Sequence, residues 1–205
     1  MGPDRDGGGA RLEAGRLIAV DPGRSSGIAA VDGEVVIWAD RVRSAAGDPW
    51  PKLQAIRAAL RALGLSLTDG GRLEALACVG FVTESQYLGR NPQSMLAVAE
   101  SATAWEVCAR LIGCEVRERE HPASWQAAFG LNRKGGTKAW RKQRMRQIID
   151  AATACGIPDQ EDVHCAVLLG IVSQMRAAGW GGDYATSCAG FAWVAEVREH
   201  SRGQT

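Results

Sequence analysis

The sequence lacks the patterns that mark membrane-spanning, secreted and zinc-binding proteins. None of its apolar runs approaches the ~20 residues that a helix needs to cross a bilayer, and its N-terminus has no apolar signal-peptide core. Its six cysteines form no C-x-x-C pair and no other short spacing, so neither a zinc site nor a redox motif is visible. We therefore expect a cytoplasmic protein whose cysteines act as small buried hydrophobic residues.

An excess of charge of one sign is also missing, because the formal net charge is only +1 over 205 residues. The overall charge therefore argues neither for nor against a polyanionic partner, and only local clusters can decide. No internal repeat and no second core are visible. The length suits one domain with a substantial core.

The two ends of the chain differ from its centre. Residues 1–15 are rich in glycine and charge, and we expect them to form a disordered leader. The ordered domain is predicted to span residues 16–178. The extension over residues 179–205 contains Gly181-Gly182 and an apolar stretch near Trp193, and its role is not readable from the sequence.

The centre of the chain predicts an α/β fold with a mixed sheet. Asp32-Gly33 separates two apolar runs, which is a strong hairpin signal, so the first three strands should form an antiparallel meander. The expected strands are Arg16–Asp21, Gly27–Val31, Glu34–Ala39, Ala75–Thr83 and Cys114–Arg117. The expected helices are Pro51–Leu63, Pro92–Ile112, Ser124–Phe129, Lys138–Cys155 and about Asp159–Ala178. Strands followed by alternating helices and strands imply a sheet covered by helices.

Three carboxylates stand where buried elements begin or end. Asp21 ends the first strand before Pro22-Gly23, Glu84 follows the second buried strand, and Asp162 lies in the first turn of the last helix. Buried carboxylates that converge repel one another, and a divalent cation removes that cost. Hard oxygen ligands favour Mg²⁺ or Mn²⁺, and two such ions about 3.5–4 Å apart can activate water and stabilise the leaving oxygen of a phosphodiester.

Each of these acids also has a purely structural interpretation. Asp21 can initiate the turn at Pro22-Gly23, and Glu84 can be an ordinary charge at a strand end. Asp159 and Asp162 can cap the last helix and satisfy its free amides. From composition and spacing alone, both interpretations stay open.

Four segments, in order, resemble the RuvC-type Holliday-junction resolvases of phages and bacteria, which belong to the RNase H-like superfamily. They are Ile18-Ala19-Val20-Asp21-Pro22-Gly23 with Ser26-Gly27; Glu84-Ser85-Gln86-Tyr87 with Asn91, Ser94 and Glu100; Pro122-Ala123-Ser124-Trp125 with Phe129-Gly130; and Pro158-Asp159-Gln160-Glu161-Asp162 continuing to Gly170. The resemblance spans residues 16–178. It implies an RNase H-like sheet and a structure-selective endonuclease. Such an enzyme would resolve four-way DNA junctions by paired cuts, one in each of two strands.

The resemblance further implies a two-ion Mg²⁺ or Mn²⁺ site in which Asp21 and Glu84 are ligands, together with acids of the last helix. Two registers are open there. Asp159 with Asp162 supplies two carboxylates, whereas Asp162 with Cys165 fits the following apolar run better but puts a thiol, a poor Mg²⁺ ligand, in an acidic position. Asp162 belongs to both registers. His164 lies about 200° from Asp162 around the helix and is expected to be a packed or surface residue.

A basic segment precedes the last helix and contains no acidic residue. Its members are Arg133, Lys134, Lys138, Arg141, Lys142, Arg144 and Arg146, interrupted by Gly135-Gly136 and Trp140. Such a segment suits a phosphate backbone, although it can also be an ordinary solvated helix face. Tyr87 can stack on bases near a branch point or can be a half-buried aromatic residue. No base-reading motif is visible, so recognition by shape is expected.

A four-way junction has two equivalent strands to cut, and a homodimer with two active sites matches that symmetry. In the resembling family the long helix, here Pro92–Ile112, forms the dimer contact.

Three rival functions remain. An actin-like kinase is disfavoured, because no glycine-rich phosphate loop follows Glu84. The others are a non-catalytic branched-DNA-binding relative with a decayed site, and a nuclease for flaps or forks.

Overall fold

The computed structural model describes residues 15–33, 35–73, 78–85, 91–132, 136–152 and 156–179. The strands are β1 Arg16–Asp21, β2 Ser25–Asp32, β3 Val35–Arg43, β4 Val79–Thr83 and β5 Glu115–Val116. The helices are α1 Pro49–Ala62, α2 Pro92–Ile112, α3 Pro122–Ala128, α4 Lys138–Ala152 and α5 Glu161–Ala177. The predicted leader and C-terminal extension lie outside the described residues, except for the ends that adjoin the fold.

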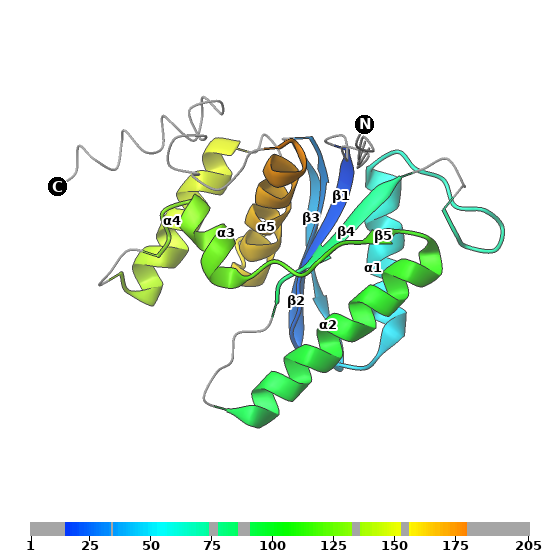
Figure 1. Cartoon of the computed structure of the whole chain (residues 1–205), viewed down its shortest axis with the longest axis horizontal. Helices are drawn as coiled ribbons and strands as arrows, with labels where there is room; N and C mark the ends of the chain where they lie inside the picture. Colours follow the sequence, from blue (N-terminus) through cyan, green and yellow to red (C-terminus); the bar gives the residue numbers. More distant parts are fainter. Residues whose placement is uncertain are drawn as a thin grey trace, which may run out of the picture.

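One mixed sheet with the strand order β3-β2-β1-β4-β5 organises these elements. The antiparallel meander β1-β2-β3 is confirmed, and β4 and β5 add to it as parallel strands. Helices α5, α4 and α3 lie on one side of the sheet, whereas α1 and α2 lie on the other (Figure 1). The predicted α/β class, with an antiparallel meander extended by parallel strands and covered by helices, is therefore confirmed.

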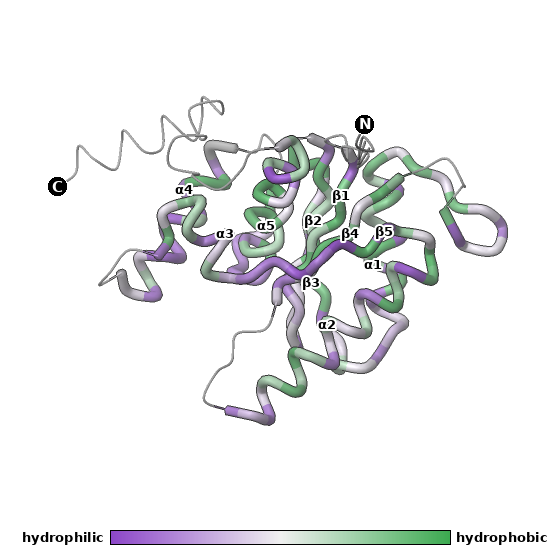
Figure 2. The backbone as a smooth tube through the Cα atoms, in the orientation of Figure 1, coloured by the Kyte–Doolittle hydropathy of each residue, from purple (hydrophilic) through white to green (hydrophobic). Residues whose placement is uncertain are grey.

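Alternation along the strands sorts the side chains into two cores. On β1, Leu17 and Ala19 pack in the core beneath α5, whereas Ile18 and Val20 pack in the core beneath α1 and α2. This alternation is what a strand covered on both faces requires. The colouring by hydropathy in Figure 2 shows the central strands as hydrophobic. The two cores together thus determine to which face of the sheet each side chain of β1 projects. By the same alternation Asp21, the last residue of β1, projects to the α5 side.

Several predicted boundaries need correction. Strand β3 extends to Arg43, four residues beyond its predicted end, because its pairing with β2 continues to the start of that strand. Helix α3 begins at Pro122, where proline is well suited to a first turn. Helix α5 begins at Glu161, so Asp159 precedes the helix. The predicted bounds of the long helix, Pro92–Ile112, are confirmed; it begins with an Asn91 cap and ends at Gly113 in the left-handed conformation.

The cysteines follow the expectation only in part. Cys108 and Cys114 are buried, as expected, but Cys78 is exposed and Cys165 is half-buried.

No helix in the described part of the chain combines the length and apolar character that crossing a membrane requires.

Candidate active site

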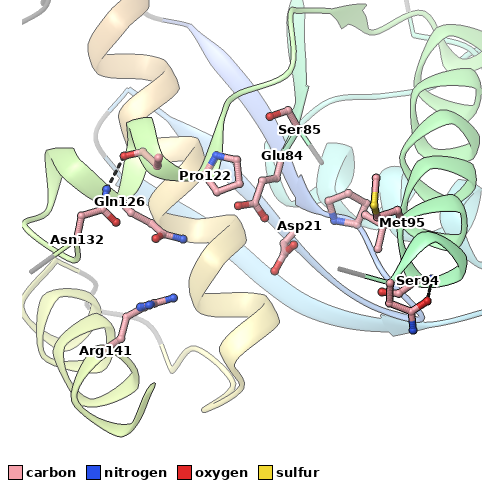
Figure 3. A pocket seen from close by; sticks show the side chains of 13 residues that line it. Asp21, Glu84, Ser85, Ser94, Met95, Pro122, Gln126, Asn132 and Arg141 are labelled. Carbon is pink, nitrogen blue, oxygen red and sulfur yellow. Dashed lines mark hydrogen bonds between the residues drawn. The ribbon is translucent and has the colours of Figure 1, made fainter. Parts of the chain in front are cut away.

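Asp21 and Glu84 meet at the ends of two neighbouring parallel strands. Asp21 is the last residue of β1, and the amide of Glu84 donates to the Val20 carbonyl at 3.1 Å. Asp21 follows Leu17 and Ala19 in the alternation and Glu84 follows Val82, so both side chains lie on the α5 side of the sheet. Their carboxyl groups lie near each other at the cavity (Figure 3), close enough that Glu84 raises the pKa of Asp21.

Two half-buried carboxyl groups that face each other strongly disfavour the doubly charged state. Burial, followed by repulsion from Glu84 and Asp162, raises the pKa of Asp21 well above its ordinary value. Burial also raises the pKa of Glu84, against the opposing effect of hydrogen bonds from Asp21 and Trp125. The pair therefore favours either a shared proton or a cation.

An indole fixes the orientation of Glu84. The Trp125 Nε1–H donates to Glu84 Oε1 at 3.1 Å, and the Trp125 ring is fully buried in the core beneath α5. Trp125 belongs to α3, which starts one residue after His121, and the charge of His121 also favours the ionised form of Glu84. The position of Glu84 therefore depends on the packing of a helix about 40 residues further along the chain.

The turn that follows Asp21 is fixed from the opposite side of the sheet. Ser26 Oγ accepts a hydrogen bond from the Gly23 amide, and the Trp105 indole donates to the same Ser26 oxygen, both at 3.1 Å. Ser101 Oγ donates to the Gly23 carbonyl, also at 3.1 Å. Ser101 and Trp105 both belong to α2, so this helix holds the turn at the end of β1.

The first turn of α5 brings Asp162 beside this pair because Gly27 has no side chain. Gly27 pairs with Asp21 across β1 and β2, and a Cβ atom at Gly27 would come within 1.9 Å of the Asp162 carbonyl oxygen. A glycine here permits a contact between backbones that any other residue prevents. Asp162 is close enough for its charge to act on Asp21. Its carboxylate accepts a hydrogen bond from Ser25 Oγ at 2.5 Å and lies 3.4 Å from Arg41 Nε.

The two registers predicted for the last helix place different residues near Asp21. Cys165 is one helical turn after Asp162, and its thiol lies close enough to Asp21 to affect the pKa of that carboxyl group. Asp159 lies before the helix, and its carboxylate pairs with Arg146 at 2.8 Å. His164 is buried, with its Nε2 atom 3.8 Å from Asp159. The structure thus brings Asp162 and Cys165 to Asp21 and directs Asp159 elsewhere.

A cavity of about 870 Å³ opens in front of Asp21 and Glu84. Arg141 of the basic helix α4 lies across the cavity from this pair, and Gln126 and Asn132 line the same side (Figure 3). The remaining lining residues are Pro22, Ser85, Asn91, Ser94, Met95, Val98, Pro122 and Ala123. One cavity therefore contains oxygen donors suited to a metal ion and a guanidinium suited to an anionic group.

The predicted DNA-binding residues are distributed over more than this cavity. Lys138, Arg141, Lys142 and Arg144 belong to α4, and Lys138 pairs with Glu161 at 3.4 Å. The side chain of Lys138 is largely exposed, with an exposed fraction of 82%. Arg133, Lys134 and Tyr87 lie outside the described residues.

The oxygen donors suit a hard divalent cation, although they are not yet gathered around one point. Two carboxyl groups in contact, with a third nearby, are the donor type that Mg²⁺ and Mn²⁺ prefer. Within the described residues, no group of three or more His, Cys, Asp and Glu side chains converges closely enough to hold a metal ion. The reason is visible at Asp162, whose carboxylate is directed toward Ser25 and Arg41.

Three residues that position these acids were not foreseen from the sequence as site residues. Trp125 lies in a segment that contributed to the family resemblance, and an indole N–H has to find an acceptor when it is buried. Ser25 and Arg41 gave no comparable signal, because Arg41 falls beyond the predicted end of its strand. Their proximity to Asp162 depends on contacts between distant segments.

Comparisons with known proteins identify the fold. No protein-family model matches the sequence, and no curated protein matches it. The structure is similar to that of T. thermophilus RuvC in complex with a Holliday junction substrate, with a TM-score of 0.56 and 14% identity over 80% of this chain and 96% of that chain. A second Thermus thermophilus RuvC structure gives a TM-score of 0.55 at 15% identity, with the same coverage. The yeast mitochondrial resolvase Ydc2 is a more distant match, with a TM-score of 0.44 and 10% identity over 91% of this chain and 82% of that chain. At this level of identity, the likeness to RuvC shows that the chain has the resolvase fold.

Proposed function

We propose that this protein is a divalent-metal-dependent endonuclease that resolves four-way DNA junctions. The observation that carries the proposal is one cavity that contains both the half-buried Asp21–Glu84 pair and Arg141, on a sheet of the RuvC type. Paired carboxylates can hold a hard cation, and a guanidinium facing them can hold the phosphate on which they act. The cavity is therefore suited to phosphodiester hydrolysis.

We propose Asp21, Glu84 and Asp162 as the ligands of the ion. A bound Mg²⁺ or Mn²⁺ would supply Lewis-acid chemistry, activating water and stabilising the oxygen that leaves the phosphodiester. The protein itself positions the two acids. Trp125 orients Glu84 through a hydrogen bond, and α2 stabilises the turn that follows Asp21. Asp159, which the sequence predicted as a further ligand, is less favoured because Arg146 engages its carboxylate. The predicted pair of ions stays a prediction.

The choice of branched DNA rests on the fold and on the basic helix. RuvC, whose fold this chain shares, is described in complex with a Holliday junction substrate. Helix α4 carries Lys138, Arg141, Lys142 and Arg144 on the same side of the sheet as the carboxylates. We propose that these side chains contact backbone phosphates, and that Arg133, Lys134 and Tyr87 extend this surface.

We also propose a homodimer formed through α2. This helix exposes Leu96, Val107 and Leu111, with exposed fractions of 70%, 48% and 60%. Large apolar side chains that remain exposed on one helix favour an interface. Sedimentation of the wild-type protein beside the Leu96→Glu/Leu111→Glu variant tests this proposal. A dimer that the variant converts to a monomer supports it, and a wild-type monomer at high concentration contradicts it.

The decisive experiment is cleavage of a labelled four-way junction with and without Mg²⁺ or Mn²⁺, beside duplex, flap and fork substrates. We expect symmetric, metal-dependent cuts that favour the junction. Asp21→Asn and Glu84→Gln should abolish cutting while leaving junction binding intact. Retained cleavage in either purified variant would refute the assignment of these ligands, and preference for flaps or forks would change the substrate.

A second candidate, a non-catalytic protein that binds branched DNA, is favoured by the thiol of Cys165 at the site. Cys165 contacts Asp21 from the position that a second carboxylate of α5 would occupy. Tight junction binding without cleavage in either metal would favour this alternative. Cleavage acquired by Cys165→Asp would then identify the thiol as the cause.

A further inference from the structure

Three residues of the meander lie side by side in one row across the sheet. Asp21 of β1 pairs with Gly27 of β2, and Gly27 pairs with Arg41 of β3. Residues directly paired across antiparallel strands project to the same face, so Asp21 and Arg41 both lie on the α5 side. Two strand spacings, roughly 10 Å, separate their backbones. The residue between them, Gly27, contributes no side chain.

The first turn of α5 occupies the space above Gly27. The Asp162 backbone would meet any Cβ atom placed there, so Asp162 stands between the acid on one side and the guanidinium on the other. Its charge acts on Asp21 by repulsion. Its carboxylate is directed the other way, accepting from Ser25 Oγ at 2.5 Å and lying 3.4 Å from Arg41 Nε. Arg41 Nε also donates to Ser25 Oγ, which ties the three side chains together.

We propose that Arg41 is the internal counter-ion of Asp162, and that Asp162 exchanges Arg41 for the divalent cation when the ion binds beside Asp21 and Glu84. The inference rests on the proposed function, because it concerns the ion of that same site. It assigns a positioning role to Arg41, which keeps the Asp162 carboxylate away from the metal site until the ion binds. It also explains why the third carboxylate is close to Asp21 and yet not gathered with it around one point.

The exchange is feasible because the ion pair is accessible and weak. The side chains of Arg41 and Asp162 keep exposed fractions of 28% and 30%, so water screens their attraction. A divalent cation carries twice the charge of a guanidinium and relieves the repulsion among three carboxylates at once. Arg41 therefore lowers the affinity for the ion, and its removal should raise that affinity.

The test measures Mn²⁺ binding directly, from the electron paramagnetic resonance signal of the free ion, without DNA. The Arg41→Gln variant is expected to bind Mn²⁺ about threefold to fivefold more tightly than the control. Arg43→Gln is that matched control: it removes the same charge two residues along β3, and among the described residues no hydrogen bond or ion pair joins Arg43 to Asp162. Comparison of the two variants separates the contact from the general effect of charge.

A second pair of variants identifies Asp162 as the partner. In an Asp162→Asn background, Arg41→Gln should change the affinity no more than Arg43→Gln does, because the ion pair is already absent. An Arg41→Gln variant that binds Mn²⁺ no more tightly than Arg43→Gln overturns the inference and leaves the proposed function standing. A wild-type protein that binds no Mn²⁺ overturns the proposed metal site, and the inference falls with it.

Discussion

At the scale of single residues, Asp21 is an acidic side chain in an environment that disfavours its ionised form. It lies half-buried at the end of β1 beside Glu84, and its loss of solvation and the repulsion from Glu84 raise its pKa. Between its ordinary value of 3.8 and the raised value, the native state binds more protons than the unfolded state, so the stability of the metal-free protein falls as pH rises through this window. The site is thus maintained at the expense of stability.

The Asp21→Asn variant should therefore be more stable than the wild type in the absence of metal. We expect a gain on the order of 1 kcal/mol in the free energy of unfolding at neutral pH, which shrinks toward about pH 4 as the wild-type carboxyl takes up its proton. Urea unfolding at several pH values measures it. Added Mn²⁺ should raise the melting temperature of the wild type alone. A variant less stable than the wild type at neutral pH would contradict this account.

Trp125 acts at the same scale through one hydrogen bond to Glu84. In Trp125→Phe, Glu84 loses a donor that favours its ionised form, so the pKa of Glu84 should rise and Mn²⁺ binding should shift to higher pH. The pH profile of Mn²⁺ affinity measures the shift. Trp105→Phe is the matched control, since it also removes a buried indole donor, but one that serves the Ser26 hydroxyl. Equal shifts in the two variants would show that only packing is involved.

At the scale of elements, the contact between α5 and β2 decides whether the site forms. Gly27 permits it, because a Cβ atom there would overlap the Asp162 backbone. Gly27→Ala should lower the free energy of unfolding by about 3 kcal/mol and weaken Mn²⁺ binding, since the first turn of α5 must move away from the sheet. Gly156→Ala, where an added Cβ meets open space, is the control in thermal unfolding. A Gly27→Ala variant as stable as the control would show that the helix adapts without cost.

At the scale of the whole molecule, the cavity links the carboxylates on the sheet to the basic helix α4. Arg141 lines the cavity, whereas Arg146 on the same helix pairs with Asp159 and Asp150. Arg141→Gln should weaken junction binding and reduce the slope of log affinity against log salt by about 0.9, the value for one released counterion. Arg146→Gln should change both much less. Titrations at several salt concentrations measure both, and equal effects would mean that binding depends only on the total charge of the helix.

The sequence by itself determined the elements and the type of chemistry. Local periodicity predicted the three-stranded meander and the bounds of α2, because alternation and helical spacing are properties of short segments. The position of Asp21 and Glu84 at strand ends also follows from local pattern, since turn residues mark where a strand stops. The resemblance to resolvases added the expected fold, which the structure confirms.

Only the tertiary structure decided which side chains meet. The phase of α5 on the sheet brings Cys165, rather than Asp159, to Asp21, and this phase depends on how the helix packs over Gly27. Arg41 reaches Asp162 through strand pairing, and Trp125 reaches Glu84 through the core beneath α5. These contacts join segments 40 to more than 100 residues apart, so they depend on packing energies that no local pattern contains.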